Sequence, residues 1–498
     1  MKGMKFRIAL CALWSLHAQA QTAASAPYTP SWQTRHQLQL LVDQAGLALP
    51  LTHWPLPSAA VSQALAGLPS ELPAPELEAA RSAVLRDLQQ RQQQGRVQLQ
   101  LRGRAEGLTG FGENYTPGSS VQAVSSEKRL DAGEVTLAGR VGVRLEDTSD
   151  ALAANPSGMG TEGRYQARLE GSAAVLGWAG WNVQAFSHRH WWGPGWQSSL
   201  VNGANTPAWN GLGIQRGTVK TSDSPWLSWM GPWNLDVFVA RAQDPQVAAR
   251  QPVGYLYSGA RLTLQPQPWL EVGLSRGMQT AGAGRPSGAT NFVKAFLGQE
   301  VNQNPGDPPD TSSQIAGFDV RVRCPQAWGP CAAYTQWMGE DAAGNPPLPY
   351  KFMKLLGLEA TYGQGRYRVF AEYADTQAGS APGYTNTYYP QGYTNGGRWI
   401  GSAQGGGSQV TTLGWMDAQS QRMLKLHTGT VLWSVGSGYP NTSAPHGTLR
   451  GLSASQTVQW QGLSWTPELS WTQLSDGQDT GASQRHNLRL GVSVQMPM

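Results

Sequence analysis

The sequence predicts an all-β transmembrane β-barrel of about 18 antiparallel strands with a small N-terminal helical segment. Three observations predict this fold: an export signal at the N-terminus, apolar residues at every second position after Gly95, and aromatic residues at the ends of many of these stretches. We expect a signal peptide over residues 1–20, a periplasmic helical segment over 21–95 and the barrel over 96–498.

The first twenty residues have the three parts of a secretory signal peptide. Lys2, Lys5 and Arg7 supply the positive charge, and residues 8–16 form a short, mostly apolar run. Ala-Gln-Ala at 18–20 is the small-x-small pattern that signal peptidase cleaves, so we expect cleavage after residue 20. A membrane-anchoring helix is the alternative, but it needs about 20 apolar residues, and this run is much shorter.

Charge and hydropathy exclude two classes of protein. Three of the 37 basic residues and none of the 32 acidic ones lie in residues 1–20, which leaves 34 against 32 and a net charge of +2. Such a balance does not suit nucleic-acid binding. No segment after residue 20 has the roughly 18 consecutive apolar residues of a membrane-spanning helix, which excludes a helical membrane protein. Barrel strands alternate, so they need no such run.

Residues 31–94 have the apolar period of short helices. Leu38, Leu41, Val42 and Ala45 fall on one helical face, and Gly46 is a plausible stop. We expect a second helix capped by Ser58 and a third that opens at Pro75 and ends in a glutamine-rich tail over 89–94. Three short helices bury little surface alone, so they need something to pack on.

After Gly95 the apolar period becomes two. Leu488, Leu490 and Val492 alternate with polar or small residues, and the stretches 97–101, 135–145, 165–175 and 367–373 follow the same pattern. One face of such a strand meets lipid, and the other meets water in the lumen. A soluble β-sandwich or propeller is the alternative, but no blade-length repeat is present.

Aromatic residues mark the ends of many strands, as expected for girdles at the two bilayer interfaces. They are Trp178, Trp181, Trp226, Trp229, Trp233, Trp269, Trp415, Trp460, Trp465 and Trp471. Long segments rich in glycine, proline and asparagine are expected to be extracellular loops. They are 105–131, 147–162, 279–313, 339–350 and 375–408.

Cys324 and Cys331 are the only cysteines after residue 20. Both flanks of this pair have the pattern of strands, so the cysteines face each other across a hairpin turn and can reach disulfide geometry. The periplasm is oxidising enough to form the bond. We expect a local hairpin disulfide, and not a metal site, because two cysteines do not complete a metal shell.

Two segments are unusually dense in aromatic and polar residues. The first is His188-Arg189-His190-Trp191-Trp192-Gly193-Pro194-Gly195-Trp196-Gln197-Ser198-Ser199-Leu200. The second is Phe370-Ala371-Glu372-Tyr373-Ala374-Asp375-Thr376, which leads to Gly397-Arg398-Trp399-Ile400-Gly401-Ser402. Together with Thr52-His53-Trp54-Pro55-Leu56, these segments resemble the Wzi-type capsule assembly proteins over nearly the whole chain.

This resemblance implies an outer-membrane barrel of roughly 18 strands with a periplasmic helical bundle. It also implies a lectin-like role in which capsular polysaccharide is retained at the cell surface. The expected partners are capsular or extracellular polysaccharide, outer-membrane lipid and the barrel assembly machinery, with no nucleic acid and no cofactor. An outer-membrane channel, either a porin or a polysaccharide-export pore, is the alternative function.

Polysaccharides offer hydroxyl groups and apolar C–H faces, which flat aromatic rings, amides and guanidinium groups bind. The candidate glycan contacts are therefore Tyr388, Tyr389, Tyr393, Arg398 and Trp399, although a girdle or simple loop packing would explain the same residues. A second group could be structural or binding, because a Gly-Pro-Gly turn flanked by large rings often packs a loop. That group is Arg189, Trp191, Trp192 and Trp196.

Catalysis has little support in the sequence. No nucleophile-elbow motif is present. Glu372 and Asp375 should point to opposite faces of one strand, and we expect them to bond lumen arginines rather than act as a glycosidase pair. His188 and His190 have no carboxylate near them in the sequence, so a metal site is not expected. The prediction is a protein without catalytic activity.

Overall fold

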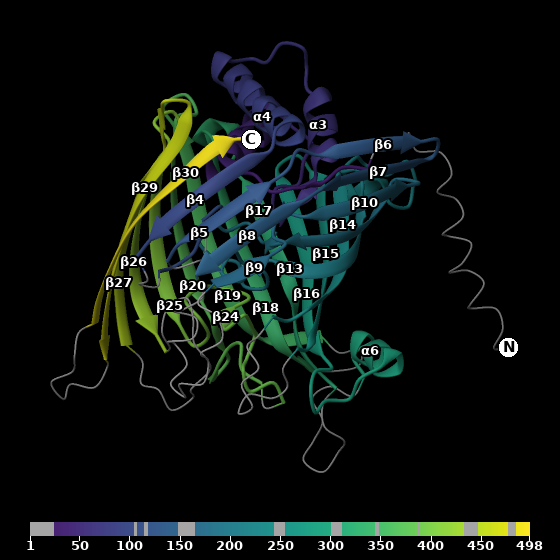
Figure 1. The fold of residues 1–498 in the computed structure, drawn as a ribbon, viewed down its shortest axis with the longest axis vertical. Helices are drawn as coiled ribbons and strands as arrows, with labels where there is room; N and C mark the ends of the chain where they lie inside the picture. Colours follow the sequence, from purple (N-terminus) through teal and green to yellow (C-terminus); the bar gives the residue numbers. More distant parts are fainter. Residues whose placement is uncertain are drawn as a thin grey trace.

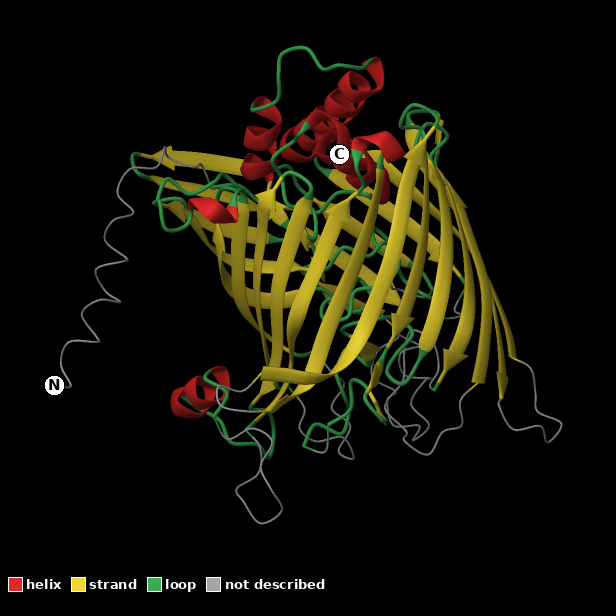
Figure 2. Cartoon of the chain, turned by 180° about the vertical axis from the view of Figure 1, so that it is seen from behind, coloured by secondary structure: helices red, strands yellow, loops and turns green. Residues whose placement is uncertain are grey.

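The computed structural model describes most of the chain after residue 23. The described ranges are 24–103, 107–113, 118–147, 165–243, 254–299, 311–343, 348–386, 388–432, 447–476 and 485–498. The predicted signal peptide over 1–20 and nearly all of the predicted loop 147–162 lie outside these ranges. Most of the described residues belong to one large antiparallel sheet that curls into a barrel, with helices gathered at one end (Figures 1 and 2).

Three helices precede the large sheet: α2 (Trp32–Ala45), α3 (Ser58–Ala66) and α4 (Pro75–Gln93). The Ser31 hydroxyl caps α2 by accepting the Thr34 N–H, and Gly46 ends α2 with a φ of 70°. Pro75 opens α4 as predicted. Ser58 does not cap α3, which corrects the prediction: it is the first helical residue and follows Pro57. None of the described helices is both long and apolar enough to cross a membrane.

The large sheet has 22 segments in the described chain. They are β4 (Arg96–Arg102), β5 (Ser120–Val124), β6 (Lys128–Ala132), β7 (Val135–Arg140), β8 (Gly142–Asp147), β9 (Tyr165–Arg168), β10 (Ala173–Trp178), β11 (Trp181–His188), β13 (Trp209–Arg216), β14 (Trp233–Arg241), β15 (Leu256–Gln267), β16 (Leu270–Thr280), β17 (Ser312–Arg323), β18 (Cys331–Ala343), β19 (Leu348–Tyr362), β20 (Tyr367–Asp375), β25 (Gln409–Asp417), β26 (Arg422–Val431), β27 (Gly447–Gln456), β28 (Val458–Trp460), β29 (Leu463–Asp476) and β30 (Arg485–Pro497).

Neighbours in sequence are mostly neighbours in the sheet, and the last strand lies beside the first. β30 pairs antiparallel with β4, and Val494 lies opposite Leu99 in that register. Four pairs of consecutive segments continue one another with a short interruption: β5 and β6, β7 and β8, β9 and β10, and β27 and β28. Accordingly β5 pairs with β8, β6 with β7, and β7 with β10.

The two-residue alternation sets the two faces of this wall. On β16, Leu274 is 48% exposed on the outside, whereas Glu271 and Ser275 are buried on the inside. The same split separates outward Leu137 from inward Thr136 on β7. The predicted strands over 97–101, 135–145 and 488–496 therefore have an apolar outer face and a polar or small inner face, as expected for a barrel, whereas 367–373 also turns Phe370 inward.

The two ends of the barrel differ. Helices α3 and α4 and the C-terminus lie at one end, which we call the helix end, and α6 (Ala289–Phe296) lies at the other, the α6 end (Figure 1). Strands meet in short turns at the helix end, such as Ala179-Gly180 between β10 and β11, where both residues have positive φ. The turn of the disulfide hairpin between β17 and β18 is also there, and Cys324 is joined to Cys331 with their Cα atoms 5.2 Å apart.

Four of the predicted loops contain regular structure, so those predictions were wrong in part. The segment 105–131 includes β5 and part of β6, and 279–313 includes α6. β18 reaches Ala343 and β19 begins at Leu348, so only a few residues separate these strands. The segment 375–408 forms two small hairpins, β21 (Gln377–Ala378) with β22 (Ala381–Pro382), and β23 (Thr394–Asn395) with β24 (Arg398–Trp399).

Candidate functional site

The lumen of the barrel has a filled part and a hollow part. Three stretches of chain, which we call the plug, fill one side: residues 31–57 with α2, residues 189–208, and residues 376–408. Their side chains form one continuous apolar core with inward residues of the wall from β11 to β26. The other side is a cavity of about 910 Å³ between the helices and the inner faces of β4, β5 and β27 to β30.

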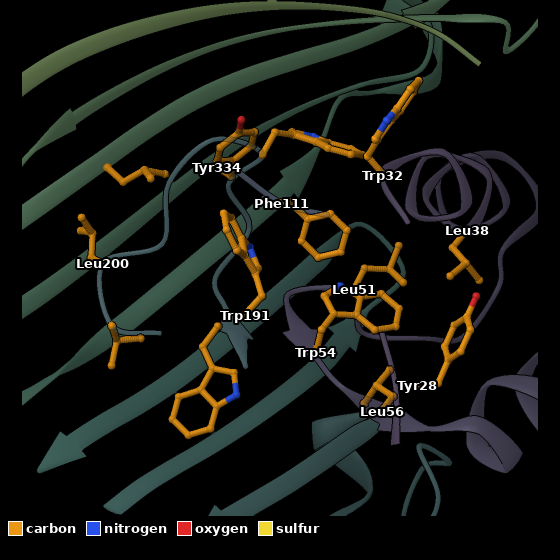
Figure 3. Packing of buried hydrophobic residues seen from close by; sticks show 14 of the residues in the cluster. Tyr28, Trp32, Leu38, Leu51, Trp54, Leu56, Phe111, Trp191, Leu200 and Tyr334 are labelled. Atoms are coloured by element: carbon orange, nitrogen blue, oxygen red, sulfur yellow. The ribbon is translucent and has the colours of Figure 1, made fainter. Parts of the chain in front are cut away.

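The plug is built from the motifs that the sequence singled out. β2 (His53–Trp54) pairs with β12 (Trp191–Trp192), so Trp54 lies opposite Trp191 and His53 opposite Trp192. Trp54 and Trp192 are fully buried. Phe111 packs between these two segments, and its ring centroid lies 5.4 Å from that of Trp191 (Figure 3). Trp191, Trp192 and Trp196 thus act in packing, which was one of the two roles left open for them.

An ion pair on the wall fixes the first stretch of the plug. The Arg261 guanidinium donates to the Thr52 carbonyl oxygen at 2.8 Å and to Asp319 on the next strand but one at 2.7 Å. The Thr52 N–H and hydroxyl both donate to Glu271 Oε1 at 2.7 Å. All four residues are buried, so each charge has a partner in place of water.

Glu372 holds the second stretch of the plug. Its carboxylate accepts the backbone N–H groups of Trp196, Gln197 and Ser198, and also the Tyr334 hydroxyl at 3.1 Å. The expectation that Glu372 bonds a lumen arginine is therefore wrong. Three successive N–H groups of an irregular turn need an acceptor, and one buried carboxylate supplies it.

Helix α2 is attached through a buried arginine. Arg35 donates to the carbonyl oxygens of Pro194 and Gly195 at 2.6 and 2.7 Å, and its guanidinium lies 4.4 and 4.2 Å from the ring centroids of Phe111 and Trp196. Burial lowers the pKa of Arg35 to about 10, so its charge persists at neutral pH. Arg35 thus joins α2 to the Gly-Pro-Gly turn.

A histidine next to Arg35 reaches the wall directly. His36 Nε2 lies 2.7 Å from the Gly365 carbonyl oxygen, and His36 Nδ1 accepts from Arg368 at 3.0 Å. These two bonds need a neutral ring with its proton on Nε2. Arg368 in turn pairs with Glu359 at 2.6 Å, and Glu359 also pairs with Arg321. Burial and the Arg368 charge lower the pKa of His36 to about 3, so the ring is neutral at physiological pH.

Most of the predicted glycan contacts belong to the third stretch of the plug. Tyr389, Tyr393, Arg398 and Trp399 are each at most 2% exposed. The Tyr393 hydroxyl lies 2.6 Å from the Tyr257 hydroxyl on β15, so this residue faces the wall. These four side chains present no ring or guanidinium face to a polysaccharide in this structure. Their burial follows from the folding of 376–408 into the lumen, which loop composition does not indicate.

Tyr388 is the exception among these candidates. It is only partly buried, and the Arg285 guanidinium lies 4.8 Å from its ring centroid, so the two side chains form a stacked pair at the α6 end. The sequence analysis missed Arg285, because more than 100 residues separate it from Tyr388. Burial raises the pKa of the neighbouring Tyr389 and the Arg285 charge lowers it. The effect of burial is larger, so the pKa of that phenol rises to about 12.

The remaining polar candidates lie at the border between plug and cavity. Arg189 pairs with Glu170 at 2.5 Å and lines the cavity. His190 Nε2 lies 3.5 Å from Asp236, a carboxylate that is distant in sequence. The rings of His188 and His190 stack on phenylalanines of the wall. Among the residues that the structure describes, no group of three or more candidate ligands is arranged to hold a metal ion.

The comparisons with known proteins agree on one family. The model of the family "Capsule assembly protein Wzi" matches residues 89–426, which is more than half of the chain. The chain belongs to this family. The resemblance inferred from the tryptophan-rich and glutamate-tyrosine motifs is therefore confirmed, and both motifs lie inside the matched range.

Two relatives are informative. A Klebsiella pneumoniae protein, described as an uncharacterized 55.8 kDa protein in the cps region, is 28% identical over 390 residues, which is 76% of this chain and 70% of that protein. The solved structure of Escherichia coli Wzi has a TM-score of 0.76 at 22% identity, and the match covers 95% of this chain and all of that one. That structure is described as an outer-membrane, carbohydrate-binding β-barrel involved in group 1 capsule assembly. The likeness confirms the barrel fold of this member of the Wzi family.

Proposed function

We propose that this protein is an outer-membrane, lectin-like barrel that attaches capsular or extracellular polysaccharide to the cell surface without catalysing a reaction. Family membership supports the role, as do a relative from a cps region and a carbohydrate-binding structural neighbour. The structural observation that supports the proposal most is the plug. Its packed core fills one side of the lumen, which suits a protein that binds polysaccharide better than one that conducts solutes.

The orientation in the membrane follows from the two ends. Barrels of the outer membrane have short periplasmic turns, so the helix end faces the periplasm and the α6 end faces the medium. This orientation agrees with export by a signal peptide that is cleaved after residue 20. The barrel assembly machinery would insert the chain, as it does other proteins of this architecture.

The outer face supplies the contacts with outer-membrane lipid. Exposed tryptophans lie near the helix end, as an interfacial girdle requires. They are Trp178, Trp226, Trp229, Trp269, Trp328 and Trp460. At the other end α6 lies against the outer wall, where the outward-facing Arg276 donates to the Ala295 carbonyl oxygen at 2.9 Å. Val293 and Leu297 are more than half exposed there and suit an interfacial position.

Tyr388 and Arg285 are the proposed polysaccharide contact at the α6 end. A phenol ring stacked with a guanidinium group offers a flat apolar face and donors side by side, which is what a sugar ring with hydroxyl groups needs. The buried residues Tyr389, Tyr393 and Trp399 fix the position of the segment that carries Tyr388.

Deletion of the gene tests the proposed function. We expect polysaccharide to be released into the medium while its total synthesis is unchanged, and complementation by the intact gene to restore retention. Complementation by a Tyr388→Ala, Arg285→Ala variant should restore retention only in part. Unchanged surface-bound polysaccharide in the deletion strain would contradict the proposal.

The channel alternative predicts a different result. A porin or export pore would give a steady open conductance in planar bilayers. We expect no such conductance from the full-length protein, because the plug is held by buried polar contacts with the wall, such as Asp43 with Arg321 and Thr52 with Arg261, and these have to break before the lumen opens. A stable open channel in the intact chain would favour the alternative.

A further inference from the structure

The hollow side of the lumen is lined by a partly exposed row of amide and hydroxyl side chains and by a second, mostly buried row beside it. Inward residues of adjacent strands lie directly opposite one another in the register of the sheet. The first row, nearest the helix end, crosses β5, β4, β30, β29 and β28. Its members are Gln122, Gln98, Gln495, Ser464 and Gln459.

A second row lies two residues deeper along the same strands. Gln100 is opposite Ser120 on one side and Ser493 on the other, and Ser493 is opposite Thr466. Arg102 and Glu468 form an ion pair one step further in. Since strands are about 4.8 Å apart, the four spacings of the first row give it a length of about 19 Å, and the three spacings of the second row give it about 14 Å. We call these two rows the amide wall.

The helices complete the cavity with the same chemistry. Gln33 and Gln37 of α2, and Gln90 and Gln94 at the end of α4, line the cavity opposite the amide wall. The glutamine-rich tail that the sequence analysis noted over 89–94 therefore faces this space. Ten glutamines of the described chain line the cavity. They are Gln33, Gln37, Gln90, Gln94, Gln98, Gln100, Gln122, Gln421, Gln459 and Gln495.

The charged residues of the cavity are mainly arginines. Among the residues that the structure describes, seven arginines, four acidic residues and no lysine line it. Arg91, Arg96 and Arg140 lie close enough to one another to interact electrostatically at the mouth of the cavity. Arg91 donates to the Thr29 carbonyl oxygen and Arg140 to the Pro27 carbonyl oxygen, so these two fix the chain before α2. Arg91 also pairs with Asp87 at 3.0 Å, which leaves arginine in excess over carboxylate at the mouth.

We propose that this cavity binds an acidic oligosaccharide segment that enters from the helix end. The amide wall and the facing glutamines hydrogen-bond the sugar hydroxyls, since each amide both donates and accepts. The arginines at the mouth bind carboxylate groups of the sugar units. This inference rests on the carbohydrate-binding function proposed above, and it adds a second site on the opposite side of the plug from Tyr388.

The composition of the cavity favours a ligand-binding site over a vestibule that holds only water. Water requires only a polar surface, and the filled side of the lumen supplies polarity with ion pairs such as Arg261–Asp319 and Arg368–Glu359. The hollow side also has charged residues, but it adds neutral amides in register over several strands. Neutral amides match an array of sugar hydroxyls and pay less desolvation than charges when a ligand covers them.

Binding of tetragalacturonate to the detergent-purified full chain tests the proposal, with maltotetraose as the neutral probe. Gln98→Leu, Gln495→Leu removes two amides of the first row at nearly constant volume, and Arg96→Gln removes a charge at the mouth. We expect the double variant to lose at least tenfold in affinity for both probes, and Arg96→Gln to lose affinity for the acidic probe alone. Arg129→Gln, an exposed site outside the cavity, is the control and should bind like the unmodified protein.

The outcomes distinguish failure of the cavity site from failure of the function proposed above. Equal binding by the unmodified protein and the double variant would overturn the cavity site. Failure of the unmodified protein to bind either probe would also overturn it, while capsule release by the deletion strain would still support the proposed function. Retained capsule in the deletion strain would overturn the proposed function itself. Unchanged thermal unfolding of the double variant would show that lost binding is not lost folding.

Discussion

The filled and hollow sides of the lumen use the same strand pattern for opposite purposes. Both sides have inward polar residues, but the filled side pairs each charge with a buried partner, as Arg261 does with Asp319, and covers it with aromatic rings. The hollow side keeps neutral amides uncovered. Buried charged groups hold the plug in place because removing a partner leaves an unpaired buried charge and destabilises the fold. Exposed amides can instead exchange bound water for a ligand. Substitutions should therefore affect stability on one side and binding on the other.

The largest effect on stability is expected at Glu372. Replacing it with alanine leaves the N–H groups of Trp196, Gln197 and Ser198 without an acceptor in a buried site. We expect a loss of about 3–5 kcal/mol, as for other buried charged partners. Thermal unfolding in detergent, monitored by tryptophan fluorescence, measures it. A change below about 1 kcal/mol would contradict the role of Glu372 as the anchor of the plug.

Acidification should weaken the plug through His36. Its pKa is about 3 in the folded chain and about 6.5 in an unfolded one, so protons bind the unfolded state more strongly. The stability that His36 contributes is complete above pH 6.5 and falls by about 1.4 kcal/mol per unit as the pH drops toward 3. Unfolding curves at pH 7 and pH 4.5 should differ less in His36→Gln than in the unmodified protein. An identical pH dependence in both would refute the assignment.

Gly277 tests how closely the third stretch of the plug approaches the wall. A Cβ atom at this position would overlap the hydroxyls of Tyr393 and Tyr257. We expect Gly277→Ala to destabilise the protein by about 1–3 kcal/mol, as overpacking does, and Gly277→Ala with Tyr393→Phe to recover part of the loss. Equal stability of the single and double variants would contradict a close contact here.

The smallest effect on stability is expected on the hollow side. Gln98 and Gln495 face the cavity, so changing both to leucine removes no buried hydrogen bond that holds the plug. We expect the free energy of unfolding to change by less than about 0.5 kcal/mol, which is typical of a substitution at a surface site. A loss comparable with that of Glu372→Ala would show that the two sides do not divide stability and binding as described.

The sequence predicts the wall of the barrel well because a period of two is a local signal. The stretches 135–145 and 488–496 became strands, and α2 and α4 begin and end near their predicted caps. The burial of Tyr389, Tyr393 and Trp399 was not predictable, because it depends on the folding of 376–408 against strands more than 100 residues away. The composition of that segment is that of an exposed loop.

The amide wall is hidden in the sequence for a related reason. Gln98 on β4 and Gln495 on β30 are neighbours because the first strand pairs with the last one, at a particular register. A shift of one residue would turn these glutamines toward lipid. Likewise Glu372 meets the turn 196–198 at a sequence separation of about 175 residues, which no local pattern encodes.

Binding of the organism's own capsular polysaccharide by the detergent-purified full chain tests the central claim most directly. We predict saturable binding that Gln98→Leu, Gln495→Leu and Tyr388→Ala, Arg285→Ala each weaken while the barrel stays folded. Absence of any saturable binding at a large excess of polysaccharide, by a protein with an intact unfolding transition, would contradict the account.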